Sequence, residues 1–231
     1  MNPFNLPKRI KTTRHSLPLL ALLLLASAST AFAQSGAWPS RPIAMVVTYP
    51  PGGGADVMAR LLAPKMGEAL GQNVIIENRP GAGGQIGAAA VAKAAPDGYT
   101  LMLDASSFAV NPSLYPKLPY DSATAFRPIG VIALFPNVVL VNPQFAARNI
   151  AELTALARSR KDFVSFASSG NGSAQHLAGA LFESAAKVDM VHVPYKGGGP
   201  ALNDVIGGQV PLFFGNLAST CLLYTSDAAD E

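Results

Sequence analysis

The chain has 231 residues, of which 49% are hydrophobic and only 13% are charged, a balance typical of a well-buried globular protein. Its 17 basic and 14 acidic residues give a net charge of +3, which is too balanced for the dense basic surface of a nucleic-acid-binding protein. A single cysteine, Cys221, excludes an internal disulfide framework. The length is ample for a hydrophobic core, so no such staple is needed.

Residues 1–33 have the three parts of a secretory signal peptide. Basic residues within 8–14 precede an apolar run at 17–25, and a small-x-small motif ends at Ala33. The apolar run is too short for a membrane anchor, because a span needs about 20 apolar residues. We therefore predict cleavage after Ala33 and a mature protein that works outside the cytoplasm.

The segments that follow alternate between strand-like and helix-like patterns. A β-branched and apolar run at 43–48 predicts a buried parallel strand, and apolar side chains on one helical stripe predict a helix at 56–70. Strands are also predicted at 74–77 and 100–104, with a small-residue helix at 85–95 between them. This βαβαβ order predicts a parallel sheet with right-handed crossovers.

The alternation restarts after an irregular stretch at residues 106–126 that is rich in proline and tyrosine. We predict a fold of the α/β class with two lobes, residues 34–135 and 136–220, each a mostly parallel sheet flanked by helices, and a cleft between them. The further predicted strands are 129–133, 138–141, 164–167, 190–193 and 210–214, and the further helices are 150–160, 174–186 and 200–206.

The last residues, 221–231, do not fit this pattern. They carry the only cysteine and follow a strand-like run. Their sequence resembles the translation of an adapter used in sequencing libraries, whereas the alternative is a C-terminal helix. The first interpretation predicts a non-native tail and a natural protein that continues past Thr220, so that the chain is truncated at its C-terminus.

Two glycine-rich loops, each between a strand and a helix, are the candidate binding elements. Ligands of open parallel sheets bind beyond the carboxyl ends of the strands, where helix N-termini offer unpaired N–H groups and a positive partial charge. In the first loop, Gly52, Gly53 and Gly54 let a ligand approach the backbone because they lack Cβ. Asp56 is a candidate N-cap of the next helix, a role that competes with ligand contact.

The second loop, residues 168–173, repeats this design directly before the helix predicted at 174–186. It combines two glycines with hydroxyl groups and the amide of Asn171, which together can bind a carboxylate without a buried cation. The alternative is an ordinary turn with a serine cap.

Nucleotide and enzyme motifs are absent from the sequence. Neither loop has the Gly-Lys-Ser/Thr end of a P-loop or the G-x-G-x-x-G pattern, no serine lies in a G-x-S-x-G elbow, and no cluster has metal-ligand spacing. We therefore expect no cofactor, no metal and no catalytic residue. Ser173 and His176, three residues apart, leave a secreted hydrolase as an alternative. His192 precedes Pro194 in a predicted strand and is expected to be structural.

A series of ordered motifs extends over residues 38–216. They are Trp38-Pro39-Ser40-Arg41-Pro42-Ile43, Tyr49-Pro50-Pro51-Gly52-Gly53 with Asp56, Glu77-Asn78-Arg79-Pro80-Gly81-Ala82-Gly83-Gly84, Pro96-Asp97-Gly98-Tyr99-Thr100-Leu101, Asn111-Pro112-Ser113-Leu114-Tyr115, Leu118-Pro119-Tyr120-Asp121, Ser169-Gly170-Asn171-Gly172-Ser173 with His176, and His192-Val193-Pro194-Tyr195-Lys196-Gly197. In this order they resemble the Bug family, the substrate-binding receptors of tripartite tricarboxylate transporters.

The resemblance implies a type II-like periplasmic-binding-protein fold and a small carboxylate held between the two glycine-rich loops, partly through water. It also implies a monomer in the periplasm that delivers its ligand to an inner-membrane permease. A receptor that presents the ligand to a membrane sensor is the alternative. The ligand contacts implied by the motifs are Tyr49, Pro51, Gly52, Gly53, Gly54, Asp56, Ser169, Gly170, Asn171, Gly172, Ser173 and His176, with Ser106, Asn111 and Tyr195 as further candidates on the wall of the cleft.

Overall fold

The computed structural model describes residues 37–159, 164–217 and 220. The predicted signal peptide and the tail at 221–231 lie outside these residues, so both remain predictions. In the part of the chain that the structure describes, no helix combines the length and the apolar character needed to cross a membrane.

The first sheet has three parallel strands, β1 (Ile43–Val47), β2 (Val74–Asn78) and β3 (Thr100–Leu103), in the order β2-β1-β3. The central strand β1 is almost entirely buried, which explains its continuous apolar sequence. The parallel sheet that was expected from the βαβαβ pattern is confirmed.

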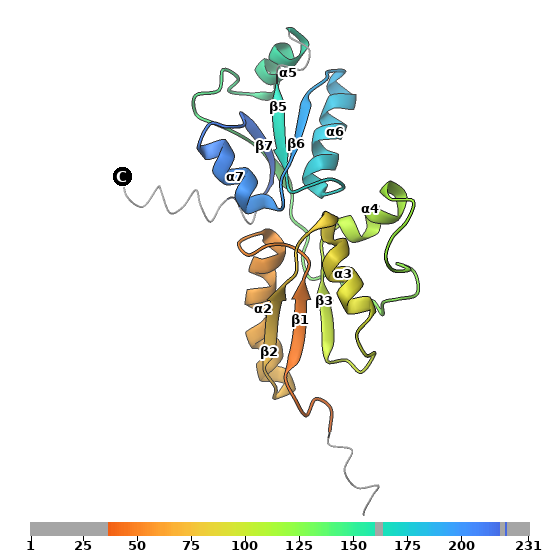
Figure 1. Ribbon diagram of the computed structural model, residues 1–231. Helices are drawn as coiled ribbons and strands as arrows, with labels where there is room; N and C mark the ends of the chain where they lie inside the picture. Colours follow the sequence, from red (N-terminus) through yellow and green to blue (C-terminus); the bar gives the residue numbers. More distant parts are fainter. Residues whose placement is uncertain (1–36, 160–163, 218–219, 221–231) are drawn as a thin grey trace, which may run out of the picture. The chain divides into compact units, whose positions relative to one another are not determined.

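Two helices cover this sheet (Figure 1). α2 (Gly54–Leu70) leads from β1 to β2, and α3 (Gln85–Ala92) leads from β2 back past β1 to β3. Because the two crossovers run in opposite directions along the sheet, right-handed connections place the helices on opposite faces. A 3₁₀ turn, η2 (Ala82–Gly84), precedes α3, and a further helix, α4 (Ser107–Leu114), follows β3. The core of this region is formed by Met45, Val47, Ala59 and Leu103.

The second sheet has four strands in the order β4-β7-β5-β6: β4 (Asn137–Val141), β5 (Ser165–Ser168), β6 (Val191–Pro194) and β7 (Leu212–Asn216). β4 is antiparallel to β7, and the other pairs are parallel. α5 (Ile150–Ser159) follows β4, whereas α6 (Ala174–Ala186) and α7 (Gly198–Ile206) connect β5 to β6 and β6 to β7. These last two crossovers again run in opposite directions, so α6 and α7 cover opposite faces.

The core of the second sheet is built around Phe166, which is fully buried and packs edge-on against Phe214 with ring centroids 5.5 Å apart. α6 can approach this ring only because residue 179 is glycine. A Cβ at Gly179 would lie 2.2 Å from the Phe166 ring. The predicted class, α/β with mostly parallel sheets flanked by helices, is therefore confirmed for both sheets.

Residues 129–133, predicted as a strand, form no strand in the structure. Their apolar, β-branched composition favours a strand, but a strand also requires a hydrogen-bonded neighbour, and none is present for them within the described residues. Residues 129–134 instead leave large side chains in solvent, with Ile129 86%, Val131 81% and Leu134 89% exposed. A helix that was not predicted, α4, lies in the stretch at 106–126 that was expected to be irregular.

Candidate functional site

The first candidate region lies where β1 and β3 end. The order of the strands reverses between these two neighbours, and ligands of open α/β sheets bind at such switch points. Thr48, directly after β1, donates a hydrogen bond of 2.8 Å from Oγ1 to Oδ1 of Asp104, directly after β3. The two strand ends are thus tied together by polar side chains.

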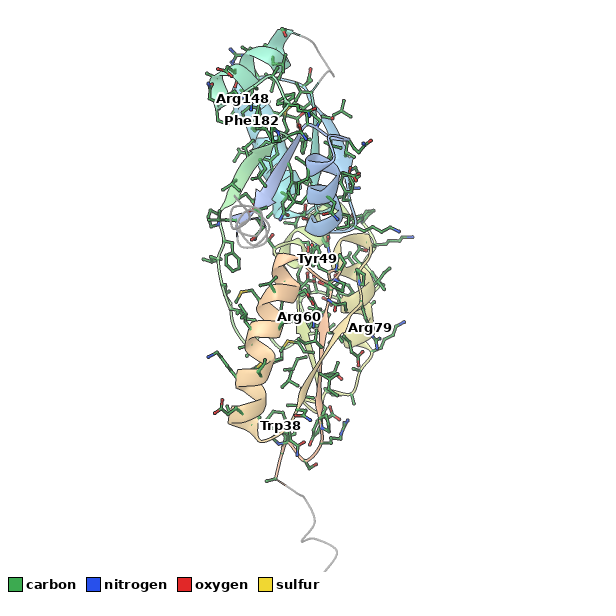
Figure 2. The ribbon with its side chains drawn as sticks, turned by 90° about the vertical axis from the view of Figure 1, so that its left-hand side faces the viewer. Trp38, Tyr49, Arg60, Arg79, Arg148 and Phe182 are labelled. Carbon is green, nitrogen blue, oxygen red and sulfur yellow. The ribbon has the colours of Figure 1, made fainter. Side chains whose placement is uncertain are left out.

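A chain of hydroxyl groups extends this contact towards the first loop. The phenol of Tyr49 donates to Ser107 Oγ at 2.7 Å, and Ser107 Oγ donates to Asp104 Oδ1 at 3.3 Å. Burial raises the pKa of Tyr49 to about 12, against a smaller lowering by the bond to Ser107. Tyr49 is therefore a neutral donor whose hydroxyl is already engaged inside the protein. Figure 2 labels Tyr49 near the N-terminal end of α2.

Asp104 is the partly buried acid of this network. Its Oδ1 accepts three hydrogen bonds, from Thr48, from Ser107 and from the Ala105 N–H at 2.7 Å, whereas its Oδ2 is buried without a partner. Burial raises the pKa of this carboxyl group above its usual range, against those hydrogen bonds. A Cβ at Gly84 would lie 3.1 Å from both carboxylate oxygens, which explains the glycine there.

Asp56 does not cap α2, in contrast to the prediction. Gly53 is the N-cap, and Asp56 lies in the first helical turn with only 2% of its surface exposed. Its Oδ2 accepts from the Gly52 N–H at 3.0 Å and from Arg60 Nε at 2.8 Å, and its Oδ1 accepts from Asn78 Nδ2 at 2.9 Å. Burial raises the pKa of Asp56, but these bonds, that from Arg60 foremost, lower it by more. Both oxygens therefore hold the first loop in shape.

The second candidate region is the loop between β5 and α6. Ser173 is the N-cap of α6, as its predicted capping role requires, because its Oγ accepts from the His176 N–H at 3.2 Å. The imidazole of His176 turns back and accepts the Gly172 N–H on Nδ1 at 3.2 Å. Gly170 and Gly172 adopt φ angles of 119° and 75°, which favour glycine.

His192 lies beneath this loop, a position that the sequence prediction did not connect with the site. Its Nε2 is 2.6 Å from Ser168 Oγ, and its ring stacks on His176 with centroids 4.0 Å apart. Burial, and secondly the charge that His176 can carry, lower the pKa of His192 to about 4. The ring is therefore neutral at pH 7.

The predicted hydrolase pair is not formed. Ser173 Oγ contacts the backbone of His176, and the ring of His176 bonds to Gly172. The serine that meets an imidazole is Ser168, but it is fully buried, so a substrate cannot reach its hydroxyl group.

The remaining candidates divide by exposure. Asn111 is fully buried: its Nδ2 donates to the Gly83 carbonyl at 3.0 Å, and its Oδ1 has no partner. Tyr195 donates to Asp204 Oδ2 at 2.6 Å, so its hydroxyl group is directed to α7. The candidates that present exposed surface are Pro51, Gly52, Ser106 and Asn171, whereas Gly53 and Ser169 are buried and Gly54 is partly buried.

Loops that follow the two sheets approach each other closely at glycines. A Cβ at Gly197 would lie 2.4 Å from Pro50 Cγ, and one at Gly172 would lie 2.7 Å from Leu114 Cδ1. The loop before α7 thus lies close to the first loop, and the second loop lies close to the end of α4.

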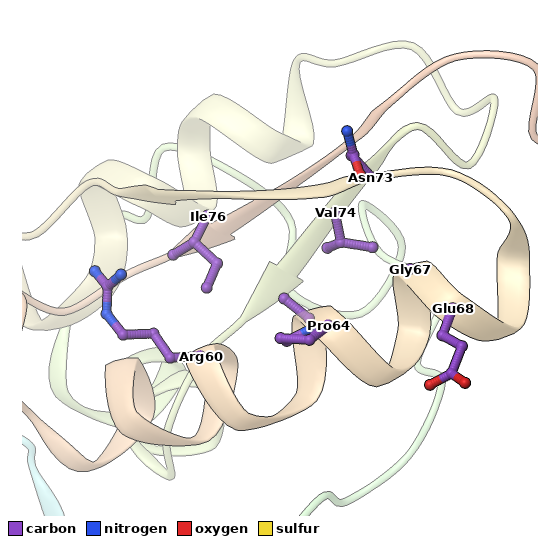
Figure 3. A pocket seen from close by; sticks show the side chains of 8 residues that line it. Arg60, Pro64, Gly67, Glu68, Asn73, Val74 and Ile76 are labelled. Atoms are coloured by element: carbon purple, nitrogen blue, oxygen red, sulfur yellow. The ribbon is translucent and has the colours of Figure 1, made fainter.

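A hollow of about 680 Å³ lies elsewhere, between α2 and the edge strand β2 (Figure 3). Figure 3 shows side chains of α2, among them Arg60 and Glu68, opposite those of β2 and the turn before it, among them Ile76 and Asn73. It includes none of the predicted contact residues, so it does not extend the candidate site.

Residues 58–223 match the model of a family described as "Tripartite tricarboxylate transporter family receptor". Curated relatives are longer than the chain: two that are each 40% identical to it are covered over 59% and 60% of their length. The chain thus spans about 60% of the length of these relatives.

Three solved structures are similar to the chain. Rpa4515 of R. palustris with adipate is 37% identical, with a TM-score of 0.79 and coverage of 82% of this chain and 64% of that one. The periplasmic binding protein BugD is 40% identical, with a TM-score of 0.74 and coverage of 82% and 63%. MatC (Rpa3494) from Rhodopseudomonas palustris with bound malate is 32% identical, with a TM-score of 0.73 and coverage of 82% and 65%. The predicted periplasmic-binding-protein fold and the resemblance to Bug proteins are confirmed.

Proposed function

The chain belongs to the tripartite tricarboxylate transporter receptor family, and we propose that it binds a small carboxylate in the periplasm and delivers it to an inner-membrane permease. The structures of Rpa4515 and MatC hold adipate and malate, which are both dicarboxylates and support a small carboxylate as the ligand class. BugD, a periplasmic binding protein, supports the location. We infer that the receptor acts as a monomer.

The observation that carries this proposal is the pair of glycine-rich loops at the starts of α2 and α6. The first N–H groups of a helix have no partner within it and carry a positive partial charge, so they attract an anion. The charged side chain nearest the first loop, Asp56, is neutralised by Arg60 at 2.8 Å. Backbone donors and neutral side chains are thus left to recognise a carboxylate.

Binding without catalysis is the second part of the proposal. Both serine–histidine contacts in the second loop serve its structure, because Ser173 caps α6 and Ser168 is buried. Buried hydroxyl groups with satisfied hydrogen bonds stabilise a loop and do not attack a substrate. An ester-hydrolysis assay should therefore give no turnover, and turnover abolished by Ser168→Ala or Ser173→Ala would contradict this conclusion.

Titration calorimetry tests the proposed ligand class. Adipate, malate, monocarboxylates, neutral sugars and metal ions should be titrated into residues 34–231 and into residues 34–220 extended by the C-terminal part of BugD. We expect a carboxylate to bind at least one form. Binding of sugars or metal ions alone, or of no compound by either form, would overturn the proposal.

A further inference from the structure

Three aromatic rings form a column beneath the second loop. Phe166 of β5 stacks on His192 of β6 with centroids 5.0 Å apart, and His192 stacks on His176 of α6 with centroids 4.0 Å apart and planes inclined by 10°. Phe166 is fully buried in the core of the second sheet. The column therefore connects the rigid sheet to the first turn of α6.

The column and the adjacent Ser168 bind the backbone N–H groups of Gly170 and Gly172, the two glycines of this loop whose φ angles are positive. Ser168 Oγ lies 2.6 Å from His192 Nε2 and accepts the Gly170 N–H at 3.1 Å, while His176 Nδ1 accepts the Gly172 N–H at 3.2 Å. A backbone N–H group held by a side chain of the protein points inward and fixes the peptide plane. The column thus determines which way the peptides of residues 170–172 face.

We propose that His192 is a positioning residue for ligand binding: through Ser168 and the ring of His176 it holds the second loop in its binding shape, and it does so only while both imidazoles are neutral. The effect on ligand affinity rests on the proposed function. The effect on the shape of the loop does not, because it follows from contacts within the second sheet and α6.

Protonation would break the contacts of the column. A protonated His176 carries a proton on Nδ1, so this atom can no longer accept the Gly172 N–H group. Two stacked imidazolium rings with centroids 4.0 Å apart would also repel each other.

Two acidic side chains near β6, Glu183 and Asp204, are engaged in hydrogen bonds of their own. Glu183 of α6 accepts the Met190 N–H at 2.6 Å, and Tyr195 donates to Asp204 of α7. The strand paired with β6 is β5, whose four residues, Ser165–Ser168, are all uncharged. Lys196, which follows β6, is exposed and has the same sign as an imidazolium. Acid pH should therefore release the loop.

NMR without ligand tests the column directly. Long-range ¹H–¹⁵N spectra should show the His176 tautomer whose Nδ1 accepts the Gly172 N–H group. The protection factors of the Gly170 and Gly172 amides, which correct for the intrinsic exchange rate at each pH, should be high at pH 7 and fall as the pH falls towards 4. His192→Phe keeps a stacked ring but loses the bond to Ser168, and Ser168→Ala loses the acceptor for Gly170. Each should raise Gly170 exchange at pH 7 at least tenfold, whereas the exposed control Gln209→Ala should not. Unchanged exchange in both variants, or a protonated Nδ1 at pH 7, would overturn the inference.

Affinity for a carboxylate then tests the link to binding. His192→Phe should weaken binding at least tenfold at pH 7 while the melting temperature stays within a few degrees of the wild type. The wild-type affinity should fall with the same pH profile as the loss of Gly172 protection. Altered exchange with unaltered affinity would overturn the positioning role alone. A wild-type protein that binds no carboxylate would instead overturn the proposed function, while the NMR result would still decide the role of the column in the loop.

Discussion

The hydroxyl group of Thr48 donates to the carboxylate of Asp104 at 2.8 Å and ties the ends of β1 and β3 together behind the first loop. The same Oδ1 atom also serves Ala105 and Ser107, while Oδ2 is buried without a partner. One oxygen atom thus organises the start of α4, and through Ser107 it holds the phenol of Tyr49.

Asp104→Ala should destabilise the protein by about 1–3 kcal/mol, because Thr48, Ala105 and Ser107 would lose their shared acceptor. Asp104→Asn is the matched control. It keeps an acceptor at the Oδ1 position and removes the cost of a buried charge, so its free energy of unfolding should stay within about 1 kcal/mol of the wild type. Urea denaturation measures both values. Equal losses in the two variants would show that the charge, and not the acceptor, is what matters.

His192 should make a pH-dependent contribution to the free energy of unfolding of the protein. Burial lowers its folded pKa to about 4 from an ordinary value of 6.5, so the unfolded chain binds the proton more tightly. This stabilising contribution is fully present above pH 6.5 and is lost as the pH falls from 6.5 towards 4. Between pH 7 and pH 5 the wild type should lose about 1 kcal/mol more than His192→Phe, a figure reduced from the full linkage because the ring is only partly buried. Equal losses in urea titrations of the two proteins would contradict the assignment.

Gly53→Val should weaken carboxylate binding at least tenfold, or about 1.4 kcal/mol, and leave the fold intact. The φ angle of Gly53 is −78°, which any residue adopts, and a new Cβ would lie 3.5 Å from the nearest atom, the Pro50 carbonyl oxygen. The variant therefore adds bulk to the loop without the backbone strain that a substitution at Gly52, with φ of 80°, would cause. Calorimetry gives the affinity and thermal unfolding checks the fold. An unchanged affinity would remove Gly53 from the binding site.

Ser173→Ala should lower stability by about 1 kcal/mol, because the His176 N–H at the start of α6 would lose its cap. Ser173→Asp, which restores an acceptor at the N-cap, should recover most of the loss. If the hydroxyl group also contacts the ligand, the affinity of Ser173→Ala should fall tenfold to a hundredfold, since a hydrogen bond to a charged group is worth roughly 1.5–3 kcal/mol. A thermal shift with unchanged affinity would leave Ser173 a capping role alone.

Local sequence patterns were sufficient to predict those helices and strands whose structure depends mainly on residues close to one another along the chain. α6 begins and ends where it was predicted, at Ala174 and Ala186, because a serine cap and an apolar stripe define it. β1 was recognisable because a central parallel strand is buried on both faces and its sequence is therefore apolar throughout. The positions of the two loops followed from these elements.

Long-range pairing could not be predicted in the same way. Asp104 and Thr48 lie 56 residues apart, and only the strand order β2-β1-β3 makes them neighbours. The stack of His192 on His176 likewise depends on how α6 crosses from β5 to β6. The segment at 129–133 shows the converse error, since its composition favours a strand whose partner the sequence pattern does not specify.

Substitutions in the apolar segment at 129–135 should have opposite effects in residues 34–231 alone and in a chain extended by the C-terminal part of a relative. Val131 and Leu134 are 81% and 89% exposed, and the chain covers only 59–60% of the length of two curated relatives. We expect the remaining length of such relatives to cover this segment. Burial of its side chains would contribute about 25 cal/mol per Å².

In residues 34–231 alone, the double variant Val131→Ser, Leu134→Ser should reduce aggregation and dye binding to exposed apolar surface at little cost in stability. In residues 34–220 extended by the C-terminal part of BugD, the double variant should lower the free energy of unfolding by about 2–5 kcal/mol, because two buried side chains would be truncated. Size-exclusion chromatography and urea denaturation measure the two effects. A loss of less than about 0.5 kcal/mol in the extended form, the range of an ordinary surface substitution, would show that the segment stays in solvent there too.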